Sequence, residues 1–285
     1  MHSLETMPLE KLLQVTPIDQ DAFEGPQPNL DAERVFGGQV LGQALVAAGR
    51  TVETGIHPNS THARFLRAPN PQEPIVYQVT RVRDGASYMN RDVRATQSIG
   101  EVLSMSLSFH RLETGFEHTI AMPSVPDPES LVPFIERMEP YTERLSQWFQ
   151  RPRAVEVRYV GMPPWEAFDH GETPQDSQVW MRAEHLESDD PLIHAAALMY
   201  ASDMTILDSA VMRHGLAWDP HRVRAATLDH GMWFHASVRA DSWFLYDQVC
   251  PWTGNGRALA TGAMYSQTGT RLATVFQEGV LRQPR

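Results

Sequence analysis

The sequence predicts an α+β fold in which one unit, a long helix followed by antiparallel strands, occurs twice. Two segments have helical character and many small residues: GGQVLGQALVAAGRTV at 37–52 and PLIHAAALMYASDMTIL at 191–207. Each is followed by four runs that have the Val, Thr, Phe and Tyr content of strands and glycine-containing turns. Because the same elements follow each helix in the same order, an internal repeat explains them better than chance does.

The spacing of the turns supports this repeat. Gly85 and Gly100 are as far apart in the first half as Gly254 and Gly269 are in the second half. The strand-like runs of the first half are STHARFLR, PIVYQVTRVRDG, SYMNRDVRATQSIG and EVLSMSLSFH. Those of the second half are VRAATLDHGMWFH, SWFLYDQVCPWTG, GRALATGAMYSQTG and TRLATVFQEGVLR.

The two predicted helices are expected to be wrapped by their sheets, because small side chains let a sheet close tightly around a helix. Between the halves, a Pro-rich stretch followed by a helical pattern indicates a linker that carries a short helix. The runs AVEVRYV and QVWMRAEH then open the second half. We expect an N-terminal domain at 1–118, a linker at 119–153 and a C-terminal domain at 154–285.

The composition excludes several classes of protein. The 285 residues are 42% apolar and 21% charged, which is typical of a soluble globular protein. A net charge of -11 argues against nucleic acid as the main partner. Lys11 is the only lysine, which removes most Schiff-base and P-loop chemistry. The chain has neither a GxSxG elbow nor an HExxH motif nor a cysteine cluster, so we expect no α/β-type serine hydrolase and no metal.

The expected location is the cytoplasm. A single cysteine, Cys250, fits a reducing compartment and is expected to be a small buried hydrophobe. The N-terminus lacks the apolar core of a signal peptide. No run approaches the roughly 20 apolar residues that a membrane helix needs, so no membrane span is expected.

Three polar residues of the second half stand in apolar surroundings. Asp203 falls on the apolar stripe of its predicted helix, four residues after Met199 and three before Ile206. A carboxylate there is costly unless it is compensated, although periodicity alone slightly favours a structural Asp whose hydrogen bonds are satisfied. Thr227 and Gln277 lie in strand-like runs that the repeat brings against this helix. Together the three suit a water molecule, with the carboxylate accepting its proton while the hydroxyl and the amide fix its position.

Four segments carry a resemblance to a known family: FGGQVLGQAL, LMYASDMTIL, ATLDHGMWFH and ATVFQEGVLR. With the repeat, they make the chain similar to the acyl-CoA thioesterases II of the TesB type, roughly from Arg34 to Arg282. The resemblance implies a double hotdog fold, hydrolysis of fatty acyl-CoA, no metal or cofactor, and a homodimer or homotetramer. It also implies that Asp203, Thr227 and Gln277 orient the attacking water, since the family's Asp, Thr and Gln fall on these positions.

This chemistry suggests two further groups of residues. The oxyanion that forms during attack needs backbone N–H donors, which the start of a helix offers, so Gly37 and Gly38 are candidates. The phosphates of coenzyme A need cations, although exposed arginines on strands are more often a solvated face. The candidates for the phosphates are Arg81, Arg83, Arg91 and Arg94.

Two other functions are compatible with a double hotdog. An enoyl-CoA hydratase of this fold uses an Asp and a His five residues apart, and Asp189 and His194 have that spacing. However, Asp190 and Pro191 suit the cap and the first turn of the helix, so a cap with a flanking His is the favoured interpretation. A non-catalytic acyl-CoA sensor is the third possibility, but it would have no use for an intact Asp–Thr–Gln set.

Overall fold

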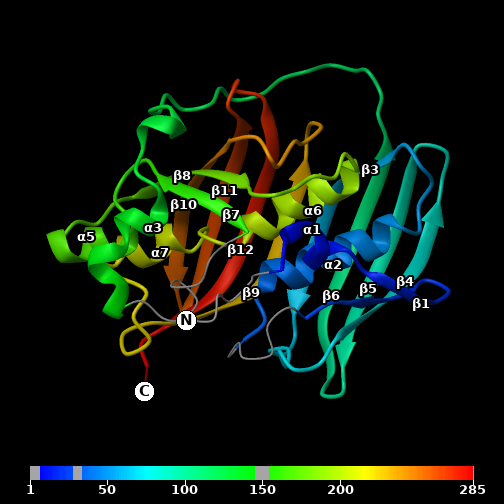
Figure 1. Ribbon diagram of the computed structural model, residues 1–285, viewed down its shortest axis with the longest axis horizontal. Coiled ribbons are helices and arrows are strands. Elements are labelled where there is room, and N and C mark those ends of the chain that lie inside the picture. Colours follow the sequence, from blue (N-terminus) through cyan, green and yellow to red (C-terminus); the bar gives the residue numbers. More distant parts are fainter. Residues whose placement is uncertain (1–6, 28–33, 145–153, 285) are drawn as a thin grey trace.

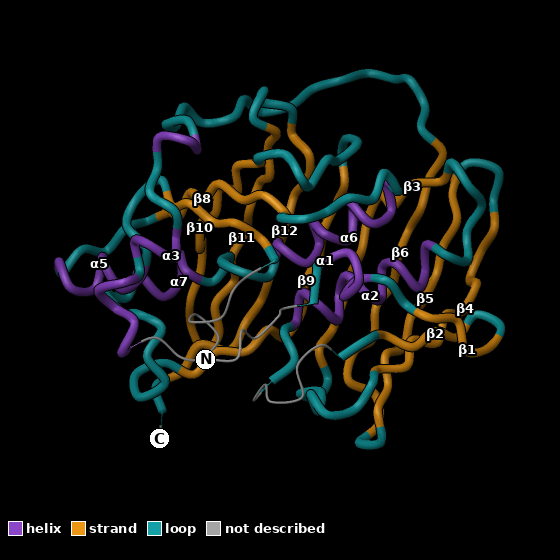
Figure 2. The backbone as a smooth tube through the Cα atoms, in the orientation of Figure 1, coloured by secondary structure: helices purple, strands orange, loops and turns teal. Residues whose placement is uncertain are grey.

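The structure, a computed structural model, describes residues 7–27, 34–144 and 154–284. In this part of the chain, twelve strands form a single antiparallel sheet that curves around two helices (Figures 1 and 2). The elements of the first half are α1 (Leu9–Leu13), β1 (Thr16–Asp19), β2 (Ala22–Gly25), α2 (Gly37–Gly49), β3 (Ile56–Phe65), β4 (Ile75–Asp84), β5 (Tyr88–Gln97) and β6 (Gly100–Arg111). Those of the second half are β7 (Val155–Tyr159), α5 (Pro164–His170), β8 (Asp176–Ala183), α6 (Pro191–Ser202), α7 (Asp208–Arg213), β9 (Arg224–Phe234), β10 (Phe244–Gly254), β11 (Arg257–Ser266) and β12 (Arg271–Arg282).

The strand order confirms the predicted repeat. From the centre outward, the first half runs β3-β6-β5-β4-β2-β1 and the second half runs β9-β12-β11-β10-β8-β7. The halves meet where β3 pairs with β9, so the sheet is continuous across the molecule. The short strands β1 and β2 and the helix α1 were not predicted. They precede α2 as β7 and β8 precede α6, and they complete the repeat.

Both halves carry a bulge in their central strand. In β3 the pairing with β6 skips Asn59, and in β9 the pairing with β12 skips Leu228. A bulge adds one unpaired residue and bends its strand. Because the two bulges occupy matching places, they give a register by which positions in the two halves can be compared.

The helices α2 and α6 pack against each other on the inner face of the sheet, and α1 contacts both. Small residues allow the two helices to approach closely, whereas the sequence predicted only that they let each sheet close around its helix. A Cβ added at Gly38 would lie 2.3 Å from the backbone oxygen of Tyr200, and one added at Gly42 would lie 3.1 Å from that of Ala196. The start of α2 is thereby held against the end of α6.

The second helix is shorter than the sequence predicts. It begins as expected, because the Asp190 side chain accepts a hydrogen bond from the N–H of Leu192 at 3.0 Å and Pro191 occupies the first turn. It ends at Ser202, and Asp203 is its C-cap. The prediction that Asp203 lies on the apolar stripe of a continuing helix is therefore wrong. Its carboxylate lies in the turn between α6 and α7.

An extended segment after β6 arches over the molecule to the second half (Figure 1). Two indole N–H groups of the second half bind its far end, Trp180 to the backbone oxygen of Pro126 at 2.9 Å and Trp243 to Glu129 at 2.8 Å.

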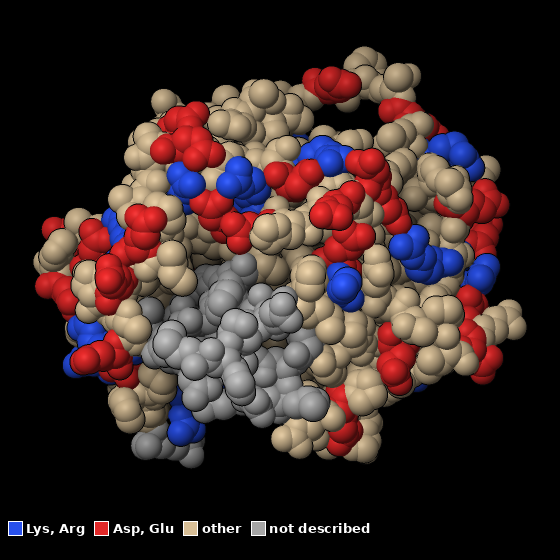
Figure 3. All heavy atoms as spheres, viewed as in Figure 1, with Lys and Arg blue, Asp and Glu red and all other residues tan. Residues whose placement is uncertain are grey.

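On the face drawn in Figure 3, the described acidic and basic side chains are interspersed. The described helical elements between β6 and β7 are the 3-10 turns η1 (Pro128–Ser130) and η2 (Glu139–Arg144) and the helix α3 (Phe134–Arg137).

The contact at Gly38 predicts a loss of stability on Gly38→Ala. Alanine favours helix by about 1 kcal/mol over glycine, but its Cβ would overlap the backbone of Tyr200, and overpacking costs about 1–3 kcal/mol. Chemical denaturation should show a lower free energy of unfolding. Gly161→Ala is the control, since a Cβ there meets nothing within 4 Å. Equal stability of the two variants would contradict the close packing.

Candidate active site

The Asp203 carboxyl group lies where the end of α6 meets the start of α2. A Cβ added at Gly37 would lie 2.5 Å from Asp203 Oδ2, so the first residue of α2 has to be glycine for the carboxyl group to fit. The backbone N–H of Gly38 also donates a hydrogen bond to this carboxyl group and thereby lowers its pKa. The positive end of the α2 dipole therefore faces Asp203, which stabilises its charged form.

The three residues singled out in the sequence form a hydrogen-bonded chain. The Thr227 hydroxyl, on β9, donates to Asp203 Oδ1 at 3.0 Å. The Gln277 amide nitrogen, on β12, donates to the Thr227 oxygen at 3.2 Å. The convergence of a carboxylate, a hydroxyl and an amide, which the repeat architecture suggested, is thus present in the fold.

The environment of Asp203 raises the pKa of its carboxyl group to about 6. The main cause is burial, which disfavours the charged form, and hydrogen bonds from Thr227, Gln277 and Gly38 oppose it. The residue as a whole keeps some solvent exposure. A carboxyl group of this pKa is ionised at neutral pH and is still basic enough to accept a proton during a reaction.

The chain of hydrogen bonds continues from Gln277 to His230, a residue for which the sequence predicted no role in the site. On β9, His230 faces Gln277 of β12 in the strand register. Its Nδ1 lies 2.6 Å from Gln277 Oε1, and its Nε2 lies 2.9 Å from the hydroxyl oxygen of Ser202. Burial lowers the pKa of this imidazole to about 4, so the ring is neutral at physiological pH. The signal for this role is the strand register, which the sequence alone does not fix.

Two residues of β10 fix the corner between α6 and α7 that carries Asp203. The Tyr246 hydroxyl donates to the backbone oxygen of Ser202 at 3.0 Å. The Gln248 amide nitrogen donates to the Thr205 hydroxyl oxygen at 2.7 Å. Both side chains are buried, and they hold the turn from beneath.

The first half lacks a matching set of polar groups. Counted from the matching bulges, the place of Thr227 is taken by Pro58 and that of Gln277 by Leu107. Neither proline nor leucine can hydrogen-bond a water through its side chain. Within the described ranges, only the second half therefore carries this site.

The structure corrects the expectation that Arg91 binds phosphate. Its side chain is 1% exposed and is paired with Asp84 at 2.5 Å. It also donates to the hydroxyl and backbone oxygens of Thr51 at 2.8 and 3.0 Å. Arg91 thus ties β5 to the end of α2, and its hydrogen bonds are used within the protein.

The other three candidate arginines are exposed. Arg81 makes a two-pronged pair with Asp21, with both N–O distances at 2.9 Å, so a carboxylate already occupies it. The side chains of Arg83 and Arg94 are exposed. All three lie on β4 or β5 of the first half.

The hydratase alternative lacks its pair of residues. Asp189 is 91% exposed and forms a salt bridge with Arg239 at 2.7 Å. His194 is buried in α6, and its Nδ1 accepts the backbone N–H of Ala240 at 3.2 Å. The carboxylate and the imidazole have different partners, which removes the basis for a hydratase using them.

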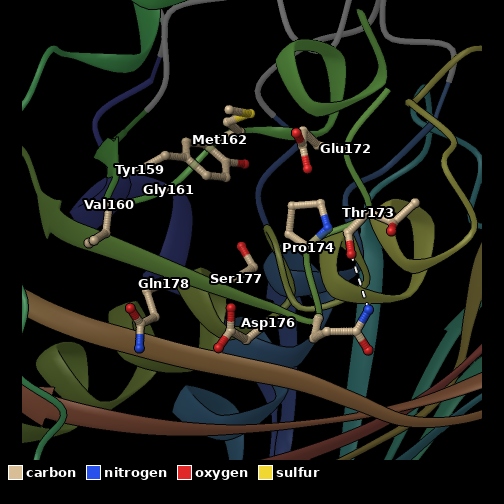
Figure 4. Close-up of a pocket in the computed structure, with 11 residues that line it drawn as sticks. Tyr159, Val160, Gly161, Met162, Glu172, Thr173, Pro174, Asp176, Ser177 and Gln178 are labelled. Atoms are coloured by element: carbon tan, nitrogen blue, oxygen red, sulfur yellow. Dashed lines mark hydrogen bonds between the residues drawn. The ribbon is translucent and has the colours of Figure 1, made fainter. Parts of the chain in front are cut away.

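A separate surface cavity of about 460 Å³ lies between the end of β7, the loops that flank α5 and the start of β8 (Figure 4). Tyr159, Ser177 and Gln178 are among its lining residues, and Gln175 donates to the backbone oxygen of Thr173 at its edge. None of the groups around Asp203 lines it. This cavity is therefore separate from the site at the end of α6.

Comparison with known proteins matches this chain and its fold to a family. The model of the acyl-CoA thioesterase N-terminal domain matches residues 26–110, and that of acyl-CoA thioesterase matches residues 149–280. The chain is 34% identical to acyl-coenzyme A thioesterase 8 of Homo sapiens, over 98% of this chain and 90% of that protein. It is 31% identical to acyl-CoA thioesterase 2 of Haemophilus influenzae, over 95% and 96% of the two chains.

Solved structures agree. The acyl-CoA thioesterase II TesB2 of Mycobacterium marinum has a TM-score of 0.78 and 35% identity to this chain, with 98% of each chain covered. A hotdog-fold protein of Alicyclobacillus acidocaldarius, 20% identical, has a TM-score of 0.76 over 97% of this chain and shows that the fold is shared.

These matches first define the class, a thioester hydrolase with a double hotdog fold. The chain belongs to the acyl-CoA thioesterase family, and within it to the TesB type. It hydrolyses acyl-CoA to free fatty acid and coenzyme A. Among the described residues, no helix is long and apolar enough to cross a membrane. The same residues contain no group of three His, Cys, Asp or Glu side chains placed to hold a metal ion.

The raised pKa of Asp203 predicts a stability effect that depends on pH. The pKa is about 6 in the folded protein against an ordinary 3.8, so the folded state binds more protons between these values. Its stability therefore falls as pH rises from about 4 through 6, by roughly 3 kcal/mol in all. Asp203→Asn removes this cost, and denaturation should show it to be more stable than the parent above pH 7.

The advantage of this variant should shrink toward zero below about pH 3, where the parent carboxyl group is protonated in both states. Asp189→Asn is the control, because it makes the same substitution at a side chain that is 91% exposed. A difference between Asp203→Asn and the parent that stays constant over pH would show that Asp203 titrates normally.

Proposed function

We propose that Asp203 is the general base of thioester hydrolysis and that Thr227 and Gln277 hold the attacking water. The observation that carries this proposal is the hydrogen-bonded chain from the Asp203 carboxylate through the Thr227 hydroxyl to the Gln277 amide. An ionised carboxylate accepts hydrogen bonds and a primary amide donates two. A water between them would therefore have its proton directed to Asp203 and its oxygen held by the amide.

The reaction proceeds by direct attack. The water oxygen forms a bond to the acyl carbon while Asp203 takes up the water's proton, and the carbonyl electron pair moves onto its oxygen. The tetrahedral intermediate then expels the coenzyme A thiolate as the carbon–sulfur bond breaks. The thiolate takes the proton from Asp203, which returns the base to its ionised form and completes the conversion to fatty acid and coenzyme A.

The start of α2 supports both the base and the oxyanion. The N–H of Gly38 already donates to the Asp203 carboxyl group, so it stabilises the ionised base. Of the two glycines considered, this leaves the N–H of Gly37 as the oxyanion donor. A single donor of this kind typically contributes about 100- to 1,000-fold to the rate.

Further features of the proposal rest on the resemblance rather than on contacts. We expect a cytoplasmic enzyme that needs no cofactor and assembles as a homodimer or homotetramer. Of the arginines considered for the coenzyme A phosphates, Arg83 and Arg94 remain candidates, because their side chains are exposed. Arg81 would first have to leave Asp21.

Kinetics of three variants test the mechanism. Asp203→Asn should lower kcat/KM by about 100- to 10,000-fold, since this is the usual contribution of a positioned base. Thr227→Val and Gln277→Leu should lower it by a smaller factor, because they leave the base in place. Release of free thiol would be measured over a ladder of acyl-CoA chain lengths. Asp229→Asn is the control, since Asp229 neighbours His230 but is exposed.

The pH profile should show the same base. Since ionised Asp203 is needed, kcat/KM of the parent should rise with pH around an inflection near 6, in line with the raised pKa. An Asp203→Asn variant with normal turnover would refute the proposal. Loss of the double bond of a crotonyl thioester without thiol release would show hydration instead.

A further inference from the structure

We propose that His230 is a positioning residue: its Nδ1–H holds the Gln277 amide so that the nitrogen, not the oxygen, faces Thr227 and Asp203. This inference rests on the proposed role of Asp203 as base. His230 itself lies one residue further along the chain of hydrogen bonds and does not touch the carboxylate. Its contribution is to orient each hydrogen bond of that series so that the donor lies on the side away from Asp203 and the acceptor on the side toward it.

The Gln277 amide has two orientations of nearly the same shape. Turning the group by 180° exchanges its oxygen and its nitrogen, so only hydrogen bonding decides between them. Gln277 is 1% exposed, and bulk water therefore cannot make the choice. Its neighbours are Thr227 on one side and His230 on the other, at 3.2 and 2.6 Å.

One orientation serves the ionised base. With the amide oxygen toward His230 Nδ1, that nitrogen carries the hydrogen and donates it. The amide nitrogen then donates to the Thr227 oxygen, which leaves the Thr227 hydroxyl hydrogen for Asp203 at 3.0 Å. Every link donates toward the carboxylate, and such hydrogen bonds lower its pKa and so keep it ionised.

The tautomer of His230 completes this arrangement. A neutral imidazole with its hydrogen on Nδ1 presents a bare Nε2, which must accept a hydrogen bond. The Ser202 hydroxyl, 2.9 Å away, is the donor. The chain thus runs from Ser202 through His230, Gln277 and Thr227 to Asp203, with one hydrogen in each link.

The reverse polarity is also available in the fold, which is why His230 matters. The Ser202 oxygen lies 2.7 Å from the backbone oxygen of Met199, to which it can donate instead. His230 would then donate from Nε2 to Ser202 and accept at Nδ1 from a turned Gln277 amide. Thr227 would donate to Gln277, and the Asp203 carboxylate would lose the Thr227 hydrogen bond.

Two nearly isosteric substitutions test the proposal. His230→Asn keeps an amide N–H near the position of Nδ1, whereas His230→Leu fills similar space with no donor. Removing one buried partner typically costs 1–3 kcal/mol, which converts to roughly 5- to 150-fold. We expect His230→Leu to lose about tenfold or more in kcat with little change in KM, and His230→Asn to keep most of the parent kcat.

The pH profile adds a readout that a purely structural role would not move. Without the His230 donor the Gln277 amide can turn, Thr227 no longer donates to Asp203, and the acid limb of kcat should shift to higher pH. The titratable groups that pack against this turn are Tyr246 of β10, whose pKa is raised by burial, and His230 itself. Neither changes charge in this range in the parent, so the shift reports on Asp203.

A spectroscopic measurement on the parent protein avoids any folding defect of the variants. The ¹⁵N shifts of His230, assigned by comparison with His230→Asn, should show the hydrogen on Nδ1 at pH 8. Hydrogen on Nε2 at that pH, or equal kcat and equal acid limbs in folded His230→Leu and parent, would overturn the proposal. If instead Asp203→Asn keeps full turnover, Asp203 is not the base. The ¹⁵N measurement of the His230 tautomer still tests the orientation of the Gln277 amide independently of that result.

Discussion

The structure depends on placing one carboxylate, that of Asp203, between the ends of two helices and away from bulk water. The loss of hydration disfavours its charge, hydrogen bonds from Thr227, Gln277 and Gly38 favour it, and the pKa of about 6 reflects the balance. The start of α2 offsets part of this cost, because Gly37 and Gly38 let its backbone reach the carboxyl group. Three features hold the carboxyl group in this place. They are the close packing of α2 and α6, the glycines that permit it, and the polar side chains of β10 that bind the turn after α6.

The repeat creates two matching helix junctions, and in the part of the chain that the structure describes only one of them carries such a site. By the symmetry of the halves, the end of α2 meets the start of α6 as the end of α6 meets the start of α2. At that second junction Arg50 forms a salt bridge with Asp190 at 2.9 Å. The strands beneath carry Pro58 and Leu107 at the matching places, so no chain of donors could form there. The same backbone thus holds a structural junction at one end and a polar site at the other.

The sequence predicted the fold well because glycine spacing and strand composition report directly on a repeated sheet. It predicted the site less directly. Periodicity places Asp203 on a helical stripe, yet it lies in the turn after the helix, where periodicity carries no information. His230 was missed because its partnership with Gln277 comes from strand register. The prediction that Arg91 binds phosphate is wrong because Arg91 faces the interior. The face of the sheet on which an arginine lies follows from the strand register, which the sequence does not give.

The central claim is that the Asp203 carboxyl group is held in an environment that raises its pKa while it stays hydrogen-bonded in its charged form. A titration of ¹³C-carboxyl-labelled aspartate by NMR tests this most directly, with the Asp203 signal identified by its absence in Asp203→Asn. The account predicts a carboxyl resonance that titrates near pH 6. A resonance that titrates near its ordinary value of 3.8 would contradict it.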